Sequence, residues 1–561
     1  MSLRIGIVAD FNTENFVRII EKQCAGMDAT VTAAPYGQAL QTLLTPTAEF
    51  WERPYDLLVI WTFPDAVSAN FNDLLDFHSR AAEDLHRDVD AFAGVVRGLG
   101  QRAHNIFLPS WIVPPGRSPR PSVEMKHGVG ATAALLQMNL RLVETLGVDP
   151  RVVLFNTDRW LRTGGAGAFS DKLWYLSKTP FSKAVFDDAA RDMIATLRGV
   201  KGQRKKVVIL DLDNTLWGGI VGDVGWEGVQ LGGHDPVGEA FAQFQRELKR
   251  LSREGVVLAL VSKNEESAAL DAIEQHPEML LRSGDFAGWR INWNDKAENI
   301  VDLMADLNLG VDSAVFIDDS PHERSRVRQA LPDVLVPEWP SDPMDYARAL
   351  RELRCFEDPG LSSEDRSRTA MYVSDRQRKQ LQTDLGSLDK WLETLGLEVR
   401  VEPLSPTNLE RTSQLLNKTN QMNLTTRRMS AQELSDWASL ENHRLWTFRV
   451  VDKIGDYGVC GIASVAFCDS RANLVDFVLS CRAMGRGVED AIISVVADRA
   501  REAGARQLVA AYVPTKKNKP CQRWFEQHSG FAPADGTQTF LLDLARDIAA
   551  PTHIRITAGA A

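Results

Sequence analysis

The sequence predicts a multidomain α/β protein, and its length and two patterns along the chain support this fold class. A chain of 561 residues corresponds to three or four domains at roughly 150 residues each. Short, mainly apolar runs at 3–9, 57–61, 151–155 and 207–210 indicate buried strands. Helical stretches lie between them, as in a sheet with helices on its faces. The polar, basic segment 201–206 ends abruptly at a strand and marks the first predicted domain boundary.

Composition and charge describe an ordinary soluble chain. The net charge of -11, from 64 basic and 75 acidic residues, argues against a general affinity for nucleic acid or anionic membrane. No apolar run approaches the ~18 residues that a membrane span needs, and the N-terminus lacks the apolar region of a signal peptide. The six cysteines show no CxxC spacing, which argues against a disulfide framework or a zinc site and favours a reducing cytoplasm.

Two carboxylates, Asp211 and Asp213, directly follow the strand 207–210. Two residues apart in an extended chain, they point to one side, and a loop after them turns the backbone carbonyl of Asp213 inward. Open parallel sheets bind ligands beyond the carboxyl ends of their strands. The pair therefore suits a nucleophilic carboxylate beside a general acid, although a lone Asp-x-Asp after a strand is more often a turn or a helix cap.

Further polar residues occur at or near the ends of later predicted strands. Ser262 follows the strand 256–261, Lys296 lies on the approach to the next one, and Asp318 and Asp319 follow the strand 313–317. Alone, each is an ordinary cap or surface charge. A carboxylate nucleophile and a phosphate repel each other, so a site built from these residues needs a divalent cation and a fixed amine.

This order of residues resembles the four motifs of the haloacid dehalogenase superfamily, which implies a Rossmann-like domain over 203–345. The resemblance implies that Asp211 attacks phosphorus and forms a phosphoaspartate. Asp213 would protonate the leaving oxygen and then activate water. Ser262 and Lys296 would hold the phosphoryl group. The residues implied to carry Mg²⁺ are Asp211, Asp213 and Asp318, with Asp319 assisting.

Longer strings resemble the FkbH-like branch of that superfamily. They are Leu212–Gly222, Arg290–Lys296, Phe316–Arg324 and Gln414–Arg428. The resemblance implies that a glyceryl group is taken from 1,3-bisphosphoglycerate, that phosphate is removed, and that a glyceryl thioester is left on an acyl carrier protein of a polyketide pathway. Many relatives carry Cys directly before Ser-Lys-Asn, whereas this chain has Val261, so a thioester relay at that position is not available.

The predicted C-terminal domain, 396–550, follows a predicted helical connector at 346–395. Its segment Leu474–Val488 runs from a strand through Arg-x-x-Gly-x-Gly into a helix, where bare backbone N–H groups and the helix dipole favour an anion. Such glycines are commonly only a turn. The pattern resembles the pyrophosphate loop of GNAT-type acetyltransferases, which implies an α+β fold and a site for a pantetheine arm. The implied residues are Arg482, Gly485, Arg486 and Gly487.

Cys481 stands immediately before this loop and has two interpretations. It is either a small buried strand residue or an acyl-accepting thiolate activated by Arg482 and the helix N-terminus. Basic side chains in this domain form either a docking face for an acidic carrier protein or ordinary solvated charges. They are Arg427, Arg428, Arg482, Arg486, Lys516, Lys517 and Lys519.

The N-terminal domain, 1–195, opens with Gly6–Asn12, which resembles the first strand of an SGNH-hydrolase-like sheet. In that family the Asp is followed by a nucleophilic Ser. Here Phe11 takes that place after Asp10, and no Asp-x-x-His stands near the end of the domain, so no triad can form. The domain is therefore predicted to be noncatalytic.

Three functions remain open. The leading hypothesis is a bifunctional glyceryltransferase and phosphatase. The second is a plain phosphatase with flanking binding modules, against which the Arg-x-x-Gly-x-Gly loop counts. The third is a carrier-protein acyltransferase that uses another acyl donor and keeps the phosphatase-like domain as a scaffold. Against it count four intact residues, Asp211, Asp213, Lys296 and Asp318.

Overall fold

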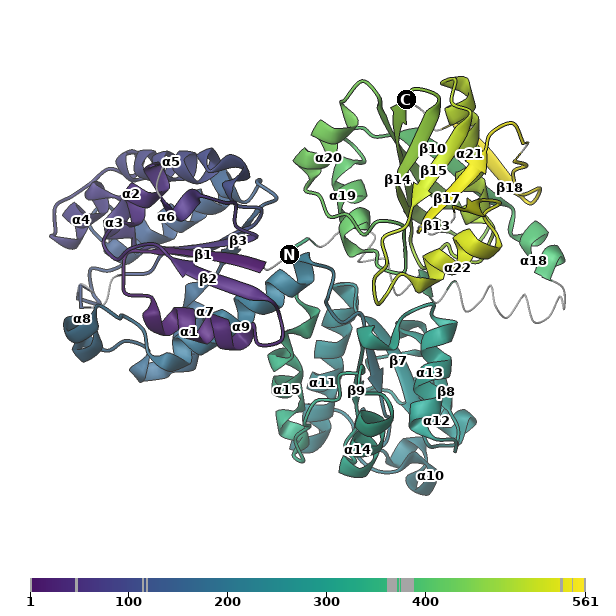
Figure 1. Cartoon of the computed structure of the whole chain (residues 1–561). Coiled ribbons are helices and arrows are strands. Elements are labelled where there is room, and N and C mark those ends of the chain that lie inside the picture. The colour runs from purple at the N-terminus through teal and green to yellow at the C-terminus, as the bar shows by residue number, and fades with distance from the viewer. Residues whose placement is uncertain are drawn as a thin grey trace. The chain divides into compact units, whose positions relative to one another are not determined.

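The structure is a computed structural model that describes residues 3–45, 49–113, 116–117, 120–360, 371–372, 374, 388–534, 538–546 and 548–558. The chain divides into two compact units, Met1–Leu197 and Arg198–Ala561. Figure 1 labels many of the helices and strands of both units. Among the described residues, no helix is long and apolar enough to cross a membrane.

The first unit contains a five-stranded parallel sheet in the order β2-β1-β3-β4-β5. The strands are β1 (Leu3–Ala9), β2 (Ala29–Ala33), β3 (Leu57–Trp61), β4 (Ile106–Pro109) and β5 (Val152–Phe155). Helices cover both faces, with α1 (Glu14–Gln23) and α9 (Lys183–Val200) packed against one core, and α2 (Ala39–Leu44), α5 (Ala82–Gly98) and α6 (Ala131–Leu146) against the other. The predicted strands β1, β3 and β5 are confirmed. The edge strand β2 was missed because its residues alternate between more and less exposed and form no apolar run.

Phe11 in this unit is a core residue. It is 1% exposed, and its ring contacts those of Trp61 and Phe181. The Asp10 carboxylate accepts a hydrogen bond from the backbone N–H of Phe63 at 2.6 Å, and burial raises its pKa to about 7. An aromatic core side chain thus occupies the position after Asp10, and the noncatalytic role of this domain stays a prediction.

The second unit contains a four-stranded parallel sheet in the order β8-β7-β6-β9. The strands are β6 (Val207–Leu210), β7 (Val257–Ser262), β8 (Phe286–Ile291) and β9 (Ala314–Ile317). Successive side chains of β6 enter two different cores, Val208 and Leu210 one and Val207 and Ile209 the other, because helices cover both faces of the sheet. The helices are α11 (Pro236–Arg253), α12 (Glu266–Gln275), α13 (Lys296–Asp306) and α14 (Pro321–Ala330).

An N-cap determines the residue at which helix α13 begins. The Asp295 side chain accepts hydrogen bonds from the backbone N–H groups of Ala297 and Glu298 at 2.9 and 3.3 Å. Such an N-cap satisfies donors that a helix start leaves unpaired and stabilises it by about 1 kcal/mol. Lys296 is consequently the first helical residue, directly after the loop that leaves β8.

This domain extends past its predicted end at residue 345. Tyr346, Leu350 and Phe356, on or just after α15 (Tyr346–Glu352), are buried in the same core as β6. Their apolar faces fill the space beside α11, so these residues complete the domain and do not belong to the predicted connector. Much of that connector, 346–395, lies outside the described residues.

The C-terminal part of the second unit is built on a mixed sheet in the order β16-β17-β15-β14-β13-β12-β10-β18, with β11 paired to β14. Its strands are β10 (Leu397–Pro403), β11 (Met422–Asn423), β12 (His443–Val451), β13 (Asp456–Cys468), β14 (Arg471–Leu479), β15 (Gln507–Ala511), β16 (Ala532–Pro533), β17 (Thr539–Asp543) and β18 (Ile554–Ala558). Its helices include α18 (Leu388–Leu395), α19 (Leu409–Lys418), α20 (Ala431–Ala438), α21 (Val488–Glu502) and α22 (Lys519–Gln527). The predicted combination of sheet and helices is confirmed, and β18 lies beyond the predicted end at 550.

Strands β14 and β15 separate part of the way along their length. They pair in parallel only from Arg471 to Leu474, and beyond that point β14 pairs with the short strand β11. Backbone hydrogen bonds of 3.0 Å from Leu424 to Phe477 and from Val513 to Leu424 continue this bridge. The segment 422–424 therefore fills the gap between the two strands.

Candidate active site

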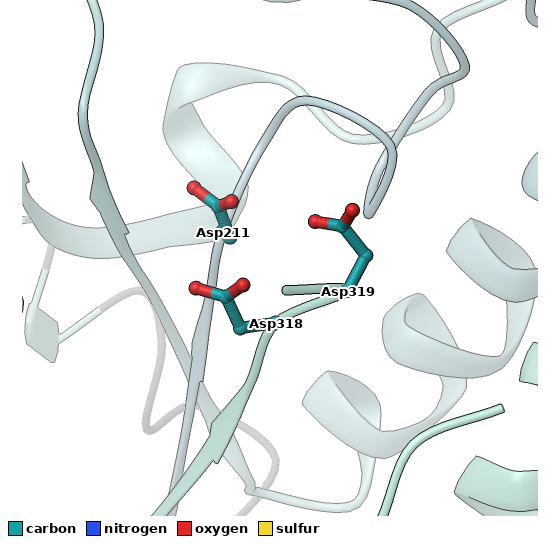
Figure 2. Close-up of side chains that lie close together, drawn as sticks. All are labelled: Asp211, Asp318 and Asp319. Atoms are coloured by element: carbon teal, nitrogen blue, oxygen red, sulfur yellow. The ribbon is translucent and has the colours of Figure 1, made fainter. Parts of the chain in front are cut away.

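Three carboxylates meet at the carboxyl ends of β6 and β9. Asp211 follows β6, Asp318 and Asp319 follow β9, and one oxygen from each lies within 4.8 Å of the others. Figure 2 shows the three side chains gathered around one space. The strand register explains the convergence, because Leu210 pairs with Ile317 and the next residues necessarily emerge together. The predicted grouping of these three residues is therefore present.

Lys296 supplies the positive charge of this cluster. Its Nζ lies 3.0 Å from Asp211 Oδ2 and 2.7 Å from Asp318 Oδ2, and the residue is only 3% exposed. Burial lowers the pKa of Lys296, but the two carboxylates outweigh burial and leave it raised. The side chain is therefore a fixed ammonium, as predicted for a group that neutralises a phosphoryl oxygen.

One ammonium does not neutralise three carboxylates. Burial and the charge of Asp211 together raise the pKa of Asp318 to about 6, because Lys296 only partly offsets these two effects. Burial and the charge of Asp211 likewise raise the pKa of Asp319. The cluster therefore carries excess negative charge that a cation would relieve.

The donor set fits Mg²⁺. Asp211 Oδ1 is buried and has no hydrogen-bond partner among the described residues, which leaves a hard oxygen atom for a ligand. Mg²⁺ in proteins is typically held by one or two carboxylates together with phosphate and water oxygens. Asp211, Asp318 and Asp319 can provide this carboxylate set.

Asp213 is held apart from the three grouped carboxylates. Its Oδ1 accepts hydrogen bonds of 3.0 Å from Trp217 Nε1 and from the backbone N–H of Val221, and its Oδ2 accepts one of 2.8 Å from Asn264. Burial raises the pKa of Asp213 despite these bonds, and a raised pKa suits a general acid. A metal contact of Asp213 through its backbone carbonyl stays a prediction.

Ser262 is the last residue of β7 and is 2% exposed. Its place at the carboxyl edge of the sheet agrees with the expectation, and its contact with a phosphoryl group stays a prediction. The neighbouring Lys263 forms an ion pair of 2.7 Å with Glu323.

Several supporting residues had no role in the sequence analysis. Arg324 donates to the backbone carbonyls of Asp318 and Asp319 at 2.7 Å each, and Thr215 Oγ1 accepts the backbone N–H of Asp319 at 3.2 Å. Asn264 holds Asp213 across 51 residues of sequence. Arg324 and Asn264 lie inside or beside the sequence motifs described above, and this position was the one available signal of their role. The spacing of residues along the chain did not reveal their hydrogen-bond partners.

Groups of the C-terminal domain itself already occupy the predicted anion loop. The backbone N–H of Gly485 donates at 2.9 Å to Glu489, a carboxylate in the first turn of α21. Arg486 donates to the backbone carbonyl of Arg482, and a Cβ added to Gly487 would lie 3.1 Å from the His553 ring. An anion at this loop would compete with Glu489, so the four residues do not form an open anion site.

Of the seven predicted docking charges, Arg482 and Arg486 are buried, and the other five separate into two groups. Arg427 forms an ion pair with the buried Asp476, and Arg428 donates to the backbone carbonyl of Thr419 at 3.2 Å. These two arginines therefore make contacts within the fold. Lys516, Lys517 and Lys519 are exposed, although Lys517 is paired with Asp312.

In the metal-free protein, we expect Asp318 to make stability fall as pH rises. Its pKa goes from 3.8 to about 6 on folding, so between these values the folded state binds more protons and the free energy of unfolding decreases with pH. Mg²⁺ should flatten this slope by binding the charged form. Chemical denaturation of wild type and Asp318→Asn from pH 4.5 to 6.5, in EDTA and in Mg²⁺, measures the difference. Identical slopes for the two proteins in EDTA would contradict the expectation.

One solved structure is similar to a large part of the chain. The N-terminal part of the protein BF1531 from Bacteroides fragilis, which contains a phosphatase domain and is complexed with Mg, is 28% identical with a TM-score of 0.58, covering 64% of this chain and 95% of that one. Together with the arrangement at Asp211, this likeness identifies a phosphatase-type domain of the haloacid dehalogenase kind in the chain.

Weaker likenesses cover about a quarter of the chain. Spermidine N-acetyltransferase from Vibrio cholerae in complex with CoA and spermine is 15% identical with a TM-score of 0.21, covering 26% of this chain and 96% of that one. A domain from Methanocaldococcus jannaschii is 14% identical with a TM-score of 0.22, covering 26% and 99%. These scores are too low to assign a fold or a function. No protein-family model and no curated protein matches the sequence.

Proposed function

We propose that the protein is a Mg²⁺-dependent glyceryltransferase and phosphatase, which loads a glyceryl unit from 1,3-bisphosphoglycerate onto the pantetheine thiol of an acyl carrier protein. One observation carries the phosphoryl chemistry: Lys296 lies between Asp211 and Asp318, while Asp211 Oδ1 is buried and has no hydrogen-bond partner in the part of the chain that the structure describes. The phosphatase domain of the similar structure, complexed with Mg, supports the same chemistry. The substrate and the carrier protein rest on the FkbH-like motif strings.

The side chains of the site divide the phosphatase step among them. Asp211 attacks phosphorus and forms a phosphoaspartate. Lys296 neutralises charge on the transferred group. Asp213, oriented by Trp217 and Asn264, gives its proton to the leaving oxygen and then takes one from the water that hydrolyses the intermediate. Mg²⁺ held by the grouped carboxylates would offset the charge between nucleophile and phosphate.

The acyl step needs no further energy source. The carbonyl of 1,3-bisphosphoglycerate is part of a mixed carboxylic-phosphoric anhydride and is already activated. Attack by a thiol forms the thioester and expels phosphate, so ATP is not required. The remaining phosphomonoester is a substrate for Asp211.

A plain phosphatase is the second candidate, because the similar structure is described by its phosphatase domain. In that case the C-terminal part would serve binding alone. The two candidates differ in whether a carrier protein gains mass.

We expect a carrier protein incubated with the enzyme, Mg²⁺ and 1,3-bisphosphoglycerate to gain the mass of one glyceryl group. Intact-protein mass spectrometry and a phosphate assay on the same samples measure the two steps. EDTA should stop the release of phosphate from the phosphomonoester at Asp211, and added Mg²⁺ should restore it, because the carboxylates repel phosphate without a cation. The carrier protein without its pantetheine arm is the control.

Phosphate release without any change in carrier mass would favour the plain phosphatase. Undiminished phosphate release in EDTA would contradict the Mg²⁺-dependent mechanism altogether.

A further inference from the structure

The side chain of Tyr346 reaches the loop that carries Asp213, although it lies beyond the motifs of the phosphatase domain. Tyr346 is the first residue of α15 and is 2% exposed. Its hydroxyl donates a hydrogen bond of 3.1 Å to the backbone carbonyl of Asn214, the residue directly after Asp213. The phosphatase step described above does not use this bond.

An aromatic cluster holds the Tyr346 ring in place. The centroid of this ring lies 5.9 and 5.7 Å from those of Phe241 and Phe244 on α11, and 5.3 Å from that of Trp339. Aromatic rings at these distances pack favourably, and Figure 1 shows α15 beside α11. Because the ring is packed on several sides, its hydroxyl is held at one position against the loop.

Asn214, which accepts this bond, has an unusual backbone conformation. Its φ is 54°, in the left-handed region that is unfavourable for residues with a Cβ. A residue keeps such a conformation only where the surrounding contacts impose it. The Asn214 side chain supplies one such contact, because its Oδ1 accepts the backbone N–H of Gly219 at 2.9 Å. The Tyr346 hydroxyl supplies another at the backbone carbonyl.

The peptide between Asn214 and Thr215 connects two parts of the site. On one side it follows Asp213, the predicted general acid. On the other side, Thr215 Oγ1 accepts the backbone N–H of Asp319, one of the three grouped carboxylates, at 3.2 Å. Rotation of this peptide would therefore move the acid relative to the carboxylate cluster. The carbonyl of this peptide is the group that Tyr346 holds.

We propose that Tyr346 is a positioning residue for the phosphatase step. Its hydroxyl holds the peptide after Asn214 and thereby keeps Asp213 in place to protonate the leaving oxygen. The inference rests on the proposed function and extends it to a helix beyond the predicted domain end at residue 345. Ser262 and Lys296 lie on other segments, β7 and α13, so their predicted contacts with the phosphoryl group should not depend on Tyr346.

The test compares two phosphomonoesters that differ in their need for an acid. The alkoxide that leaves 3-phosphoglycerate is a strong base and needs a proton, whereas 4-nitrophenolate is a weak base and leaves 4-nitrophenyl phosphate without one. Tyr346→Phe keeps the ring and removes only the hydroxyl. In this variant we expect kcat/KM with Mg²⁺ to fall roughly tenfold for 3-phosphoglycerate, because small displacements of a catalytic group have effects of this size. The fall for 4-nitrophenyl phosphate should be less than about threefold, since that ester does not depend on the acid.

Equal falls for the two esters would show that Tyr346 supports the fold and not the acid. No fall for either ester would remove Tyr346 from the mechanism. Both results would overturn the inference, whereas a wild-type protein that hydrolyses neither ester would contradict the proposed function itself.

Tyr55→Phe is the matched control. The Tyr55 hydroxyl is also buried and also donates to a backbone carbonyl, that of Phe50, at 2.8 Å. Tyr55 belongs to the unit Met1–Leu197, which contributes no residue to the proposed phosphatase step. The control should therefore lose a comparable hydrogen bond without a change in kcat/KM for either ester.

Amide hydrogen exchange gives a readout that needs no turnover. In EDTA, a peptide that covers residues 213–219 should exchange several-fold faster in Tyr346→Phe than in wild type, because the loop opens more readily without this bond. In Tyr55→Phe the same peptide should exchange at the wild-type rate. Wild-type exchange of this peptide in Tyr346→Phe would mean that the hydroxyl does not hold the loop, and it would overturn the inference whatever the kinetics show.

Discussion

Asp211→Asn is expected to abolish phosphate release from a phosphomonoester, by a factor on the order of 10³ or more, as for other enzymes that lose their nucleophile. The amide has nearly the same shape as the carboxylate but cannot attack phosphorus. The fold should be kept, because Lys296 retains its 2.7 Å contact with Asp318. In EDTA the variant should be at least as stable as wild type, since one carboxylate leaves a cluster with excess negative charge.

Phosphate release at saturating substrate and chemical denaturation, on the same preparation, measure both effects. Asp223→Asn is a suitable control, because this exposed carboxylate lies in α10 (Val221–Val224), shortly after the catalytic loop, and contributes no oxygen to the cluster. A well-folded Asp211→Asn protein that releases phosphate at the wild-type rate would remove Asp211 from the mechanism.

Lys296→Met is expected to have the largest effect on stability. The ammonium is buried between two carboxylates, and removing one partner of a buried charge pair typically costs about 3–5 kcal/mol. Met has a similar length, so lost packing contributes little. Mg²⁺ should restore much of this stability because it supplies positive charge to the same oxygens, but it should not restore phosphate release, since the fixed donor is gone.

Denaturation with and without Mg²⁺ distinguishes the two effects. Lys263→Met is the matched control: its ion pair with Glu323 is partly exposed, and such pairs are worth at most about 1 kcal/mol. If Lys296→Met were as stable as wild type in EDTA, the charge balance described for the cluster would be wrong.

The positions of the reacting residues could be predicted because they follow strands. An apolar run of four to seven residues predicts a strand, and in a parallel sheet the residues that follow neighbouring strands share one edge. Asp211, Asp318 and Asp319 obey this rule and lie together. The strand β8 did not show the pattern, because Gly288 and Arg290 interrupt its apolar residues.

Contacts between distant segments could not be predicted in this way. The bond from Asn264 to Asp213 spans 51 residues, and those from Arg324 to the carbonyls after β9 depend on how α14 turns back over the loop. Spacing along the chain carries no information about such partners, since their distance is set by the packing of helices against the sheet.

The C-terminal loop was also predicted only in part. Its glycines and arginines were correctly placed between a strand and a helix, and Gly485 and Gly487 do have positive φ angles of 75° and 79°. Whether the loop is open depends on Glu489, which accepts the N–H of Gly485 from the first turn of α21, and on segment 422–424, which reaches β14 through tertiary contacts.

The sequence by itself therefore determined the α/β class, the strand that ends just before Asp211, and the order of acid, serine, lysine and acid pair that indicates phosphoryl transfer. These features depend on periodicity and local order, which the chain carries directly. Only the tertiary structure decided that Asn264 holds Asp213 apart from the carboxylate cluster, that segment 422–424 fills the gap between β14 and β15, and that Cys481 lies partly exposed after the end of β14. Those outcomes depend on which distant side chains compete for the same hydrogen bonds and charges, and that competition is settled only when the segments pack.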